Sequence, residues 1–262
     1  MRFEEIQAFY EDQKNIWNLA ERNIELLKSS VRKPFRAGDL DGYVLLNAAR
    51  AVSTLARIDK DSIERRKCFL CANNRPAEQK GIEILSGFEL LVNPFPILPF
   101  HFTIVHKQHV PQTLILETGL ELAEILENMV VFFNAAGAGA SAPDHLHFQA
   151  VPKEELPLIK LLEEKSGKPV DLPFTADCNP DRTLSVTTPL NAYFWKSQNE
   201  TKFVVIHRKT HRPKEFYLDP PFRRGISPGA IDMAGVLVTP FQEDFDSISE
   251  EDIVNIYRQV AF

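Results

Sequence analysis

The sequence has few cysteines and no long apolar run. Its 262 residues include three cysteines, an odd and small number that excludes the disulfide framework of small secreted domains. No apolar stretch reaches the roughly 18–20 residues that are needed to span a bilayer. The first residues, "MRFEEIQAFYEDQKNIWNLAERNIELL", have the spacing of an acidic amphipathic helix and differ from a signal peptide. We therefore expect a cytoplasmic protein that does not enter a membrane.

Positive charge is also scarce. The chain has 30 lysines and arginines against 36 aspartates and glutamates, which gives a formal net charge of −6 at pH 7. A negative protein is a poor general binder of nucleic acids and of anionic membrane surfaces. We expect small-molecule partners instead, and any phosphate-binding site must come from a local group of basic residues.

The segment "HRKTHRPK" at residues 207–214 is such a local group, because it contains no acidic residue. Lys209 and Arg212 are candidate phosphate contacts there, although a solvated hairpin edge explains the segment as well. Arg50 in "LLNAARAVS" is a weaker candidate of the same kind. Asp232 is a candidate for contact with a sugar hydroxyl, and a turn or cap role explains it equally well.

Apolar periodicity predicts single helices alternating with short strands. Helices are predicted over residues 3–28, over 118–133, around "EELPLIKLLEEK", and at the C-terminus, where Ser249 and Asp252 form a capping box. Strands are predicted at "GYVLLN", "FELLVNP", "HFTIVHK", "HLHFQAVP", "NAYFWKSQ", "KFVVIHRK" and "DMAGVLVTP". We therefore predict an α+β fold with a mainly antiparallel sheet flanked by helices. An open sheet edge would allow a homodimer. The last helical pattern runs to Phe262 without a stop signal, as in a truncated chain.

The stretch "SAPDHLHFQA" at residues 141–150 places His145, His147 and Gln149 at alternate positions. On a β-strand these side chains share one face, and the apolar residues between them face a core. For one histidine, a solvated polar face would be the better explanation. Two histidines and a glutamine at the exit of a glycine-containing loop favour an active site.

The loop before that stretch, "GAGAS", lacks bulky side chains. Gly137 and Gly139 can adopt positive φ and let a ligand approach backbone N–H groups. Those amides and the Ser141 hydroxyl predict a phosphate cradle, for which a simple turn is the alternative. A neighbouring neutral imidazole can attack phosphorus and form a phosphoramidate, which strengthens the phosphate interpretation.

Three segments carry a resemblance to a known family. "CFLCANNRP", "VHKQHVPQTL" and "GAGASAPDHLHFQ" resemble, in this order, segments of galactose-1-phosphate uridylyltransferase. That family lies in the histidine-triad superfamily, in the branch with diadenosine tetraphosphate phosphorylase and GDP-L-galactose phosphorylase. "HLHFQA" and "SPGAIDMAGVLV" are most similar to the GDP-hexose phosphorylases. The resemblance covers residues 40–250 in patches and is strongest at 68–75 and 139–150.

The resemblance implies a histidine-triad-like fold in two tandem halves. Residues 1–155 would contain the nucleophile and a zinc site, and residues 156–262 would complete the sheet and the substrate site. His147 would be the nucleophile that accepts a nucleoside monophosphate. Ser141 would contact the departing β-phosphate, and Asn134 would lie near the nucleotide. The sequence departs from the family in having "PDHLH" in place of His-Pro-His, which shifts the loop register by about one position.

Gln149 occupies the position of a third histidine in the hydrolases of the superfamily. Its amide can hydrogen-bond a phosphoryl oxygen but does not titrate near neutral pH. The resemblance therefore implies a nucleotidyltransferase or phosphorylase that acts on a nucleoside diphosphate sugar or a dinucleoside polyphosphate. Inorganic phosphate or a sugar phosphate would be the acceptor. The alternatives are a nucleotide hydrolase of the same fold and a zinc-stabilised nucleotide-binding protein without turnover.

The C-x-x-C of Cys68 and Cys71 can hold one metal ion if two further ligands complete a tetrahedron. The resemblance implies a structural zinc ion with these four ligands: Cys68, Cys71, His109 and His145. Either His101 or His106 is an alternative to His109. Without a metal, the pair would be two reduced, buried thiols.

Overall fold

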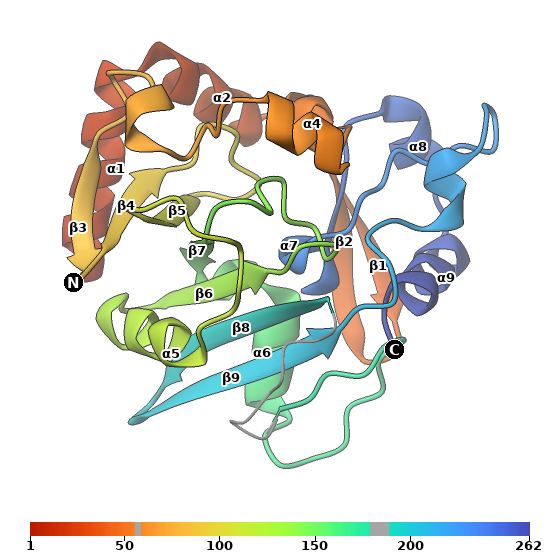
Figure 1. The fold of residues 1–262 in the computed structure, drawn as a ribbon. Helices are drawn as coiled ribbons and strands as arrows, with labels where there is room; N and C mark the ends of the chain where they lie inside the picture. Colours follow the sequence, from red (N-terminus) through yellow and green to blue (C-terminus); the bar gives the residue numbers. More distant parts are fainter. Residues whose placement is uncertain (56–58, 179–188) are drawn as a thin grey trace.

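The computed structural model describes residues 1–55, 59–178 and 189–262, and its centre is a seven-stranded sheet (Figure 1). Every neighbouring pair of strands in this sheet is antiparallel. The strands follow one another in the order β3 (Gly81–Leu85), β4 (Phe88–Val92), β5 (Phe102–His106), β7 (His147–Pro152), β6 (Met129–Asn134), β8 (Leu190–Ser197) and β9 (Glu200–His207). The predicted α+β fold with a mainly antiparallel sheet is confirmed.

A second sheet joins the two ends of the described chain. Its order is β1 (Arg32–Ala37), β2 (Leu40–Leu46) and β10 (Val236–Thr239). Strand β1 pairs with β2 in antiparallel fashion, whereas β10 runs parallel to β2. The seven-stranded sheet likewise draws strands from both sides of residue 155, so the division into halves at that residue stays a prediction.

Helices cover both faces of the large sheet. The longer ones are α1 (Phe3–Ile16), α2 (Asn18–Lys28), α5 (Leu116–Ile125), α6 (Pro157–Glu164) and α9 (Glu250–Val260). The short ones are α3 (Ala51–Thr54), α4 (Lys60–Arg65), α7 (Ala230–Met233) and α8 (Gln242–Ser247). Single 3-10 turns lie at Ala48–Arg50, Ala72–Asn74, Lys153–Glu155 and Lys214–Tyr217. Within the described residues, no helix combines the length and apolarity that crossing a membrane requires.

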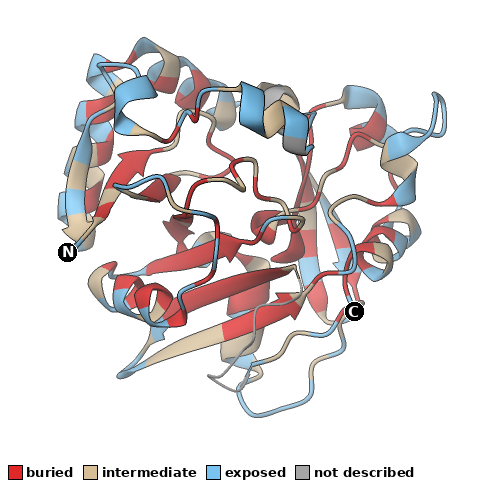
Figure 2. Cartoon of the chain, viewed as in Figure 1, coloured by how far each residue is buried: buried red, intermediate tan, exposed pale blue. Residues whose placement is uncertain are grey.

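Strand β6 is buried on both faces, and this overturns part of the helix prediction (Figure 2). Val130 and Phe132 belong to the core under α6, α9 and the small sheet, while Val131 and Phe133 belong to the core under α1, α2 and α5. A strand buried on both faces is apolar at every position, so its spacing also fits a helical stripe. The predicted helix over 118–133 is therefore wrong after Ile125, where α5 ends.

Of two further helix predictions, the structure corrects the N-terminal one and confirms the capping box of the C-terminal one. The predicted helix over 3–28 is interrupted at the buried Trp17, whose backbone is extended, and the chain turns there between α1 and α2. The C-terminal capping box is confirmed, because the Ser249 hydroxyl accepts from the Asp252 N–H at 3.1 Å and the Asp252 carboxylate accepts from the Ser249 N–H at 3.0 Å. The sequence pattern also predicts a loop before β8, and part of that segment, 179–188, lies outside the described residues.

Candidate active site

A row of cross-strand neighbours forms the floor of a cavity on the large sheet. Leu91, Thr103, Gln149 and Phe132 are successive partners across β4, β5, β7 and β6. All four line a cavity of about 510 Å³, and so does His147 at the start of β7. The predicted alternation holds from this residue on, because Phe148 and Ala150 point into the opposite core. The structure thus places His147 and Gln149 in one cavity.

The walls of the cavity come from segments far apart in the sequence. One wall is the C-x-x-C segment, and another is the loop at 139–141 with the end of β6. The rest comes from the N-terminal third, residues 93–97 and the segment 211–238. Candidate residues from these walls that line the cavity are Arg50, Asn134, Gly139, Ser141, Arg212 and Asp232. Gly137 and Lys209 lie outside the lining, and Nζ of Lys209 instead donates to the carbonyl of Arg258 at 3.0 Å.

His147 is held in a single tautomer. Its Nδ1 lies 2.8 Å from the carbonyl oxygen of His145, and a carbonyl only accepts. The proton of the neutral ring is therefore on Nδ1, and Nε2 carries the lone pair. Burial lowers the pKa of His147 to about 4, so the ring is neutral at pH 7. This is the protonation state that a nucleophilic imidazole requires.

Gln112 fixes the backbone that presents His147. Its Oε1 accepts from the N–H of His147 at 2.8 Å, and its Nε2 donates to the carbonyl of the same residue at 3.0 Å. The same Nε2 donates to the carbonyl of Asn134 at 2.9 Å, which ties the end of β6 to the start of β7. Gln112 lies in "VHKQHVPQTL", a segment that carries the resemblance, but its role was not predicted.

A buried amide network orients Asn134. Its Oδ1 accepts from Nδ2 of Asn191 at 2.8 Å and from the N–H of Ala230 at 2.7 Å. Asn191 in turn accepts from Arg208 at 2.7 Å. With its oxygen engaged twice, Asn134 has its Nδ2 amide as the group available to a ligand in the cavity. Sequence patterns did not signal Asn191 and identified Arg208 only as part of the basic segment 207–214, because the partners of both residues lie in other segments.

The glycine loop has the predicted backbone but a different hydrogen-bond pattern. Gly137 and Gly139 have φ of +75° and +101°, as expected for glycine. A Cβ on Gly139 would lie 2.5 Å from Cα of Gly229, so the loop packs directly on the 228–230 segment. The N–H of Gly139 donates to Nδ1 of His211 at 3.3 Å and is engaged within the protein. The side chain of Ser141 lines the cavity.

Two basic candidates and one acid line the cavity. Burial lowers the pKa of Arg50 to about 10, which leaves it a cation at neutral pH, and one of its nitrogens donates to the carbonyl of Phe95 at 3.1 Å. Arg212 donates to the carbonyl of Thr54 at 2.8 Å. The carboxylate of Asp232 accepts from two backbone N–H groups, those of Gly229 and Val238, which is a cap and turn role. Burial raises its pKa to about 6.

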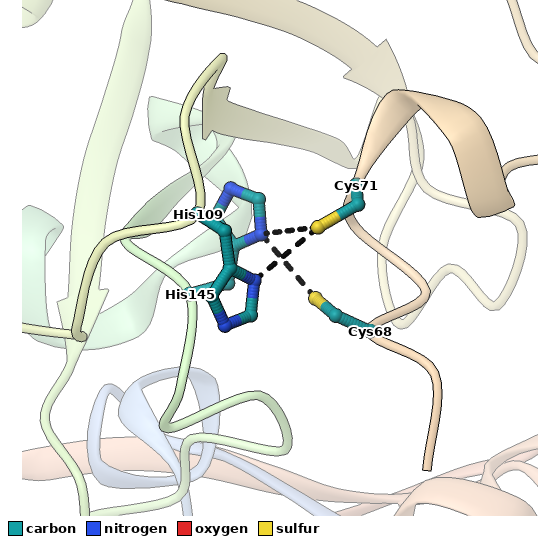
Figure 3. A group of neighbouring side chains, drawn as sticks. All are labelled: Cys68, Cys71, His109 and His145. Carbon is teal, nitrogen blue, oxygen red and sulfur yellow. Dashed lines mark hydrogen bonds between the residues drawn. The ribbon is translucent and has the colours of Figure 1, made fainter.

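A cluster of two cysteines and two histidines lies beside the cavity (Figure 3). Cys68, Cys71, His109 and His145 each offer one ligand atom, and these atoms lie within 4.8 Å of one another. Nδ1 of His145 is 3.3 Å from Sγ of Cys68 and 3.5 Å from Sγ of Cys71, and Nδ1 of His109 is 3.2 Å from Sγ of Cys71. Two thiolates and two imidazoles at these distances fit a tetrahedral zinc ion.

The protonation pattern of the cluster agrees with ligation. Nε2 of His145 donates to the carbonyl of His106 at 2.7 Å, so its Nδ1 lone pair faces the sulfur atoms. Burial alone would raise the pKa of Cys68, but its close contact with His145 and the hydrogen bonds from the backbone N–H groups of Leu70 and Cys71 outweigh burial and lower the pKa to about 6. The residues present can therefore hold a metal ion.

The position of His145 corrects one sequence expectation. Its backbone N–H bonds to Ala142 in a turn, and β7 begins two residues later. His145 therefore points to the cysteines and does not share the strand face of His147 and Gln149. The alternative ligands lie elsewhere: His101 contacts Gln149 at 2.8 Å, and the ring of His106 contacts the carbonyl of Gln108 at 3.0 Å.

The fold is similar to that of yeast Ap4A phosphorylase Apa2. The crystal structure with AMP has a TM-score of 0.58 and 15% identity, and the match covers 98% of this chain and 96% of that one. The structure with Ap4A has a TM-score of 0.55 and 16% identity over 95% and 97% of the two chains. The structure of Apa2 alone has a TM-score of 0.56 and 15% identity over 95% and 94%.

In sequence, no curated protein matches the chain. A family profile described as "Domain of unknown function (DUF4922)" matches residues 9–152, a segment that contains the C-x-x-C, the glycine loop and His147. Because this match covers more than half of the residues, the chain belongs to the DUF4922 family.

Proposed function

We propose that this protein is a nucleotidyltransferase or phosphorylase that acts through a covalent nucleotidyl-histidine. The observation that carries the proposal is the state of His147: it is buried in a cavity, neutral, and hydrogen-bonded through Nδ1, so that Nε2 keeps its lone pair. A nucleophilic histidine must be neutral and must keep one nitrogen lone pair free for attack, whereas a purely structural histidine has no such requirement. The proposed substrates are nucleoside diphosphate sugars and dinucleoside polyphosphates.

The reaction would be a double displacement. Nε2 of His147 attacks the α-phosphorus, a P–N bond forms, and the P–O bond to the departing phosphorylated group breaks. Inorganic phosphate or a sugar phosphate then attacks the same phosphorus and releases His147. The amides of Gln149 and Asn134 and the hydroxyl of Ser141 would donate to the phosphoryl oxygens, where negative charge develops. Arg50 and Arg212 supply positive charge in the same cavity.

The nucleotide class is supported by the structural neighbours. Apa2, which has the same fold, is described as a phosphorylase and was crystallised with AMP and with Ap4A. The share of each chain covered is above nine-tenths, so the likeness extends over the whole fold. Gln149 favours transfer over hydrolysis, because an amide cannot act as a general base toward water near neutral pH.

A zinc ion held by Cys68, Cys71, His109 and His145 would supply rigidity. The side chain of His145 belongs to this cluster, while its carbonyl accepts the Nδ1–H of His147. Fixing the side chain would therefore fix the carbonyl that sets the tautomer of the nucleophile. The location in the cytoplasm, expected from the sequence, agrees with the three reduced cysteines and stays a prediction.

The test is covalent capture. The protein is incubated with nucleotides labelled at the α-phosphate, denatured, and examined for retained label. We expect an acid-labile, base-stable adduct that His147→Ala abolishes and that His207→Ala, a histidine outside the cavity lining, retains. Release of the adduct by phosphate or a sugar phosphate supports transfer, and release by water alone identifies a hydrolase. Nucleotide binding without any adduct identifies a binding protein and overturns the covalent mechanism.

A further inference from the structure

His101 is a fully buried histidine that contacts the cavity floor. It lies immediately before β5, the strand that pairs with β7, and its ring packs 6.1 Å from the ring of Phe132, centroid to centroid. Its Nδ1 lies 3.2 Å from the backbone nitrogen of Ile97, and a backbone N–H only donates. Nδ1 is therefore the acceptor, and the proton of the ring is on Nε2. Burial lowers the pKa of His101 to about 3, which keeps the ring neutral.

This tautomer decides which way the amide of Gln149 points. Nε2 of His101 lies 2.8 Å from Oε1 of Gln149, so the imidazole N–H donates to the amide oxygen. The reversed amide would bring its own N–H groups against the N–H of His101, two donors with no acceptor between them. The oxygen is thus held against His101, and the NH₂ group of Gln149 is the end left for the cavity that Gln149 lines.

The direction matters because the two ends of an amide have opposite effects on a phosphoryl group. An N–H donor stabilises the negative charge that gathers on phosphoryl oxygens in the transition state. An amide oxygen in the same place would repel them. Free glutamine side chains rotate between both orientations, so a catalytic donor needs a partner that selects one of them.

We infer that His101 is a positioning residue for the transfer reaction: through the relay Ile97–His101–Gln149 it holds the amide of Gln149 with its N–H groups toward the transferred phosphoryl group. The inference rests on the proposed function, since it assigns a task within the same site. His101 itself is not among the residues that line the cavity, so it acts through Gln149. Its effect is on the chemical step and not on nucleotide affinity, because the donor gains strength as charge develops.

The test compares two substitutions with a matched control. His101→Phe keeps an aromatic ring but removes both hydrogen bonds, His101→Gln restores an N–H donor toward Gln149, and His207→Phe makes the same change outside the cavity lining. Single-turnover formation of the His147 adduct is measured against nucleotide concentration. For His101→Phe we expect the rate at saturation to fall by about tenfold or more, with the half-saturating concentration changed by less than about threefold. His101→Gln should recover most of the rate, and the control should keep it.

Nitrogen-15 NMR of the wild-type protein tests the tautomer directly, whether or not the variants fold. We expect a protonated Nε2 and an unprotonated Nδ1 for His101, and a protonated Nδ1 overturns the inference. If His101→Phe forms the His147 adduct at an unchanged rate, or if it loses nucleotide affinity while the rate at saturation is kept, the inference is also overturned. Absence of any adduct in wild type rejects the proposed function instead, and the NMR result still decides how Gln149 is oriented.

Discussion

At the scale of single residues, hydrogen bonds with only one allowed direction determine the state of the site. His147 donates through Nδ1 to a carbonyl, and His101 accepts through Nδ1 from a backbone N–H. Two histidines in one region of the sheet are therefore held in opposite tautomers. One presents a lone pair and the other presents a proton, and backbone geometry sets both. Sequence identifies the histidines but carries no information on which nitrogen holds the proton.

The burial of neutral His101 predicts acid sensitivity. Its pKa is lowered from 6.5 to about 3 in the folded protein. As the pH falls below 6.5, His101 therefore binds a proton in the unfolded chain but not in the folded chain, and this favours unfolding. Stability from this residue is present above pH 6.5 and is lost as the pH falls toward 3. Between pH 7.5 and 5 the wild type should lose about 2 kcal/mol more than His101→Phe. Urea unfolding at both pH values measures the difference, and equal losses would contradict it.

At the scale of elements, the contact between two loops builds the cavity wall. The 135–141 loop and the 228–230 segment meet at Gly139 and Gly229, where backbone approaches backbone. The amide network joins the same two segments, because Asn191 donates to the carbonyl of Ala138 and to Oδ1 of Asn134, which also accepts from the N–H of Ala230. Secondary structure by itself does not predict this contact, because the contacting glycines lie in irregular backbone before α7 and in the loop after β6.

Substitution of Gly139 tests this loop contact. Alanine there would meet Cα of Gly229 at 2.5 Å and would require a φ of +101°, so the loop must move. We expect Gly139→Ala to lower the rate of adduct formation by tenfold or more, since a displacement of about 1 Å at a catalytic site has that order of effect. Gly167→Ala is the matched control: Gly167 has a similar positive φ of +76°, and its added Cβ meets nothing within 4 Å. Equal effects of both variants would show that strain alone, and not the contact, is responsible.

At the scale of the whole molecule, the Cys/His cluster links three separate parts of the chain. The C-x-x-C segment, the loop after β5 and the turn before β7 meet there, and outside the cluster these segments have little regular structure. A metal ion would therefore stabilise the fold and the cavity wall together. This makes metal content a property that stability measurements can detect.

The prediction for the whole molecule concerns its zinc content and the effect of removing the metal ion on its melting temperature. Protein purified without chelators should contain about one zinc per chain, and chelation should lower the melting temperature by roughly 5–15 °C if a few kcal/mol of stability are lost. Cys71→Ser should lose the zinc, whereas Cys178→Ser, an exposed cysteine outside the cluster, should keep it. Metal analysis with thermal unfolding decides the question. Stable protein that lacks metal would contradict the zinc assignment.

The sequence by itself determined the fold class and most of the strands, and the family resemblance supplied the four residues that meet in the Cys/His cluster. The fold class and the strands follow from local periodicity, which is visible within a few residues. It did not separate α5 from β6, because a strand buried on both faces and an amphipathic helix have the same apolar pattern over 118–133. Nor did it separate His145, which lies in the Cys/His cluster, from the strand face of His147.

Only the tertiary structure decided how the polar residues act. Gln112, His101 and Asn191 orient His147, Gln149 and Asn134 through hydrogen bonds between residues 35 to 57 positions apart in the chain. Such partners are brought together by strand order, which no local pattern encodes. The tautomer of the proposed nucleophile and the direction of the Gln149 amide therefore follow from the folded sheet and not from the residues of "HLHFQ" alone.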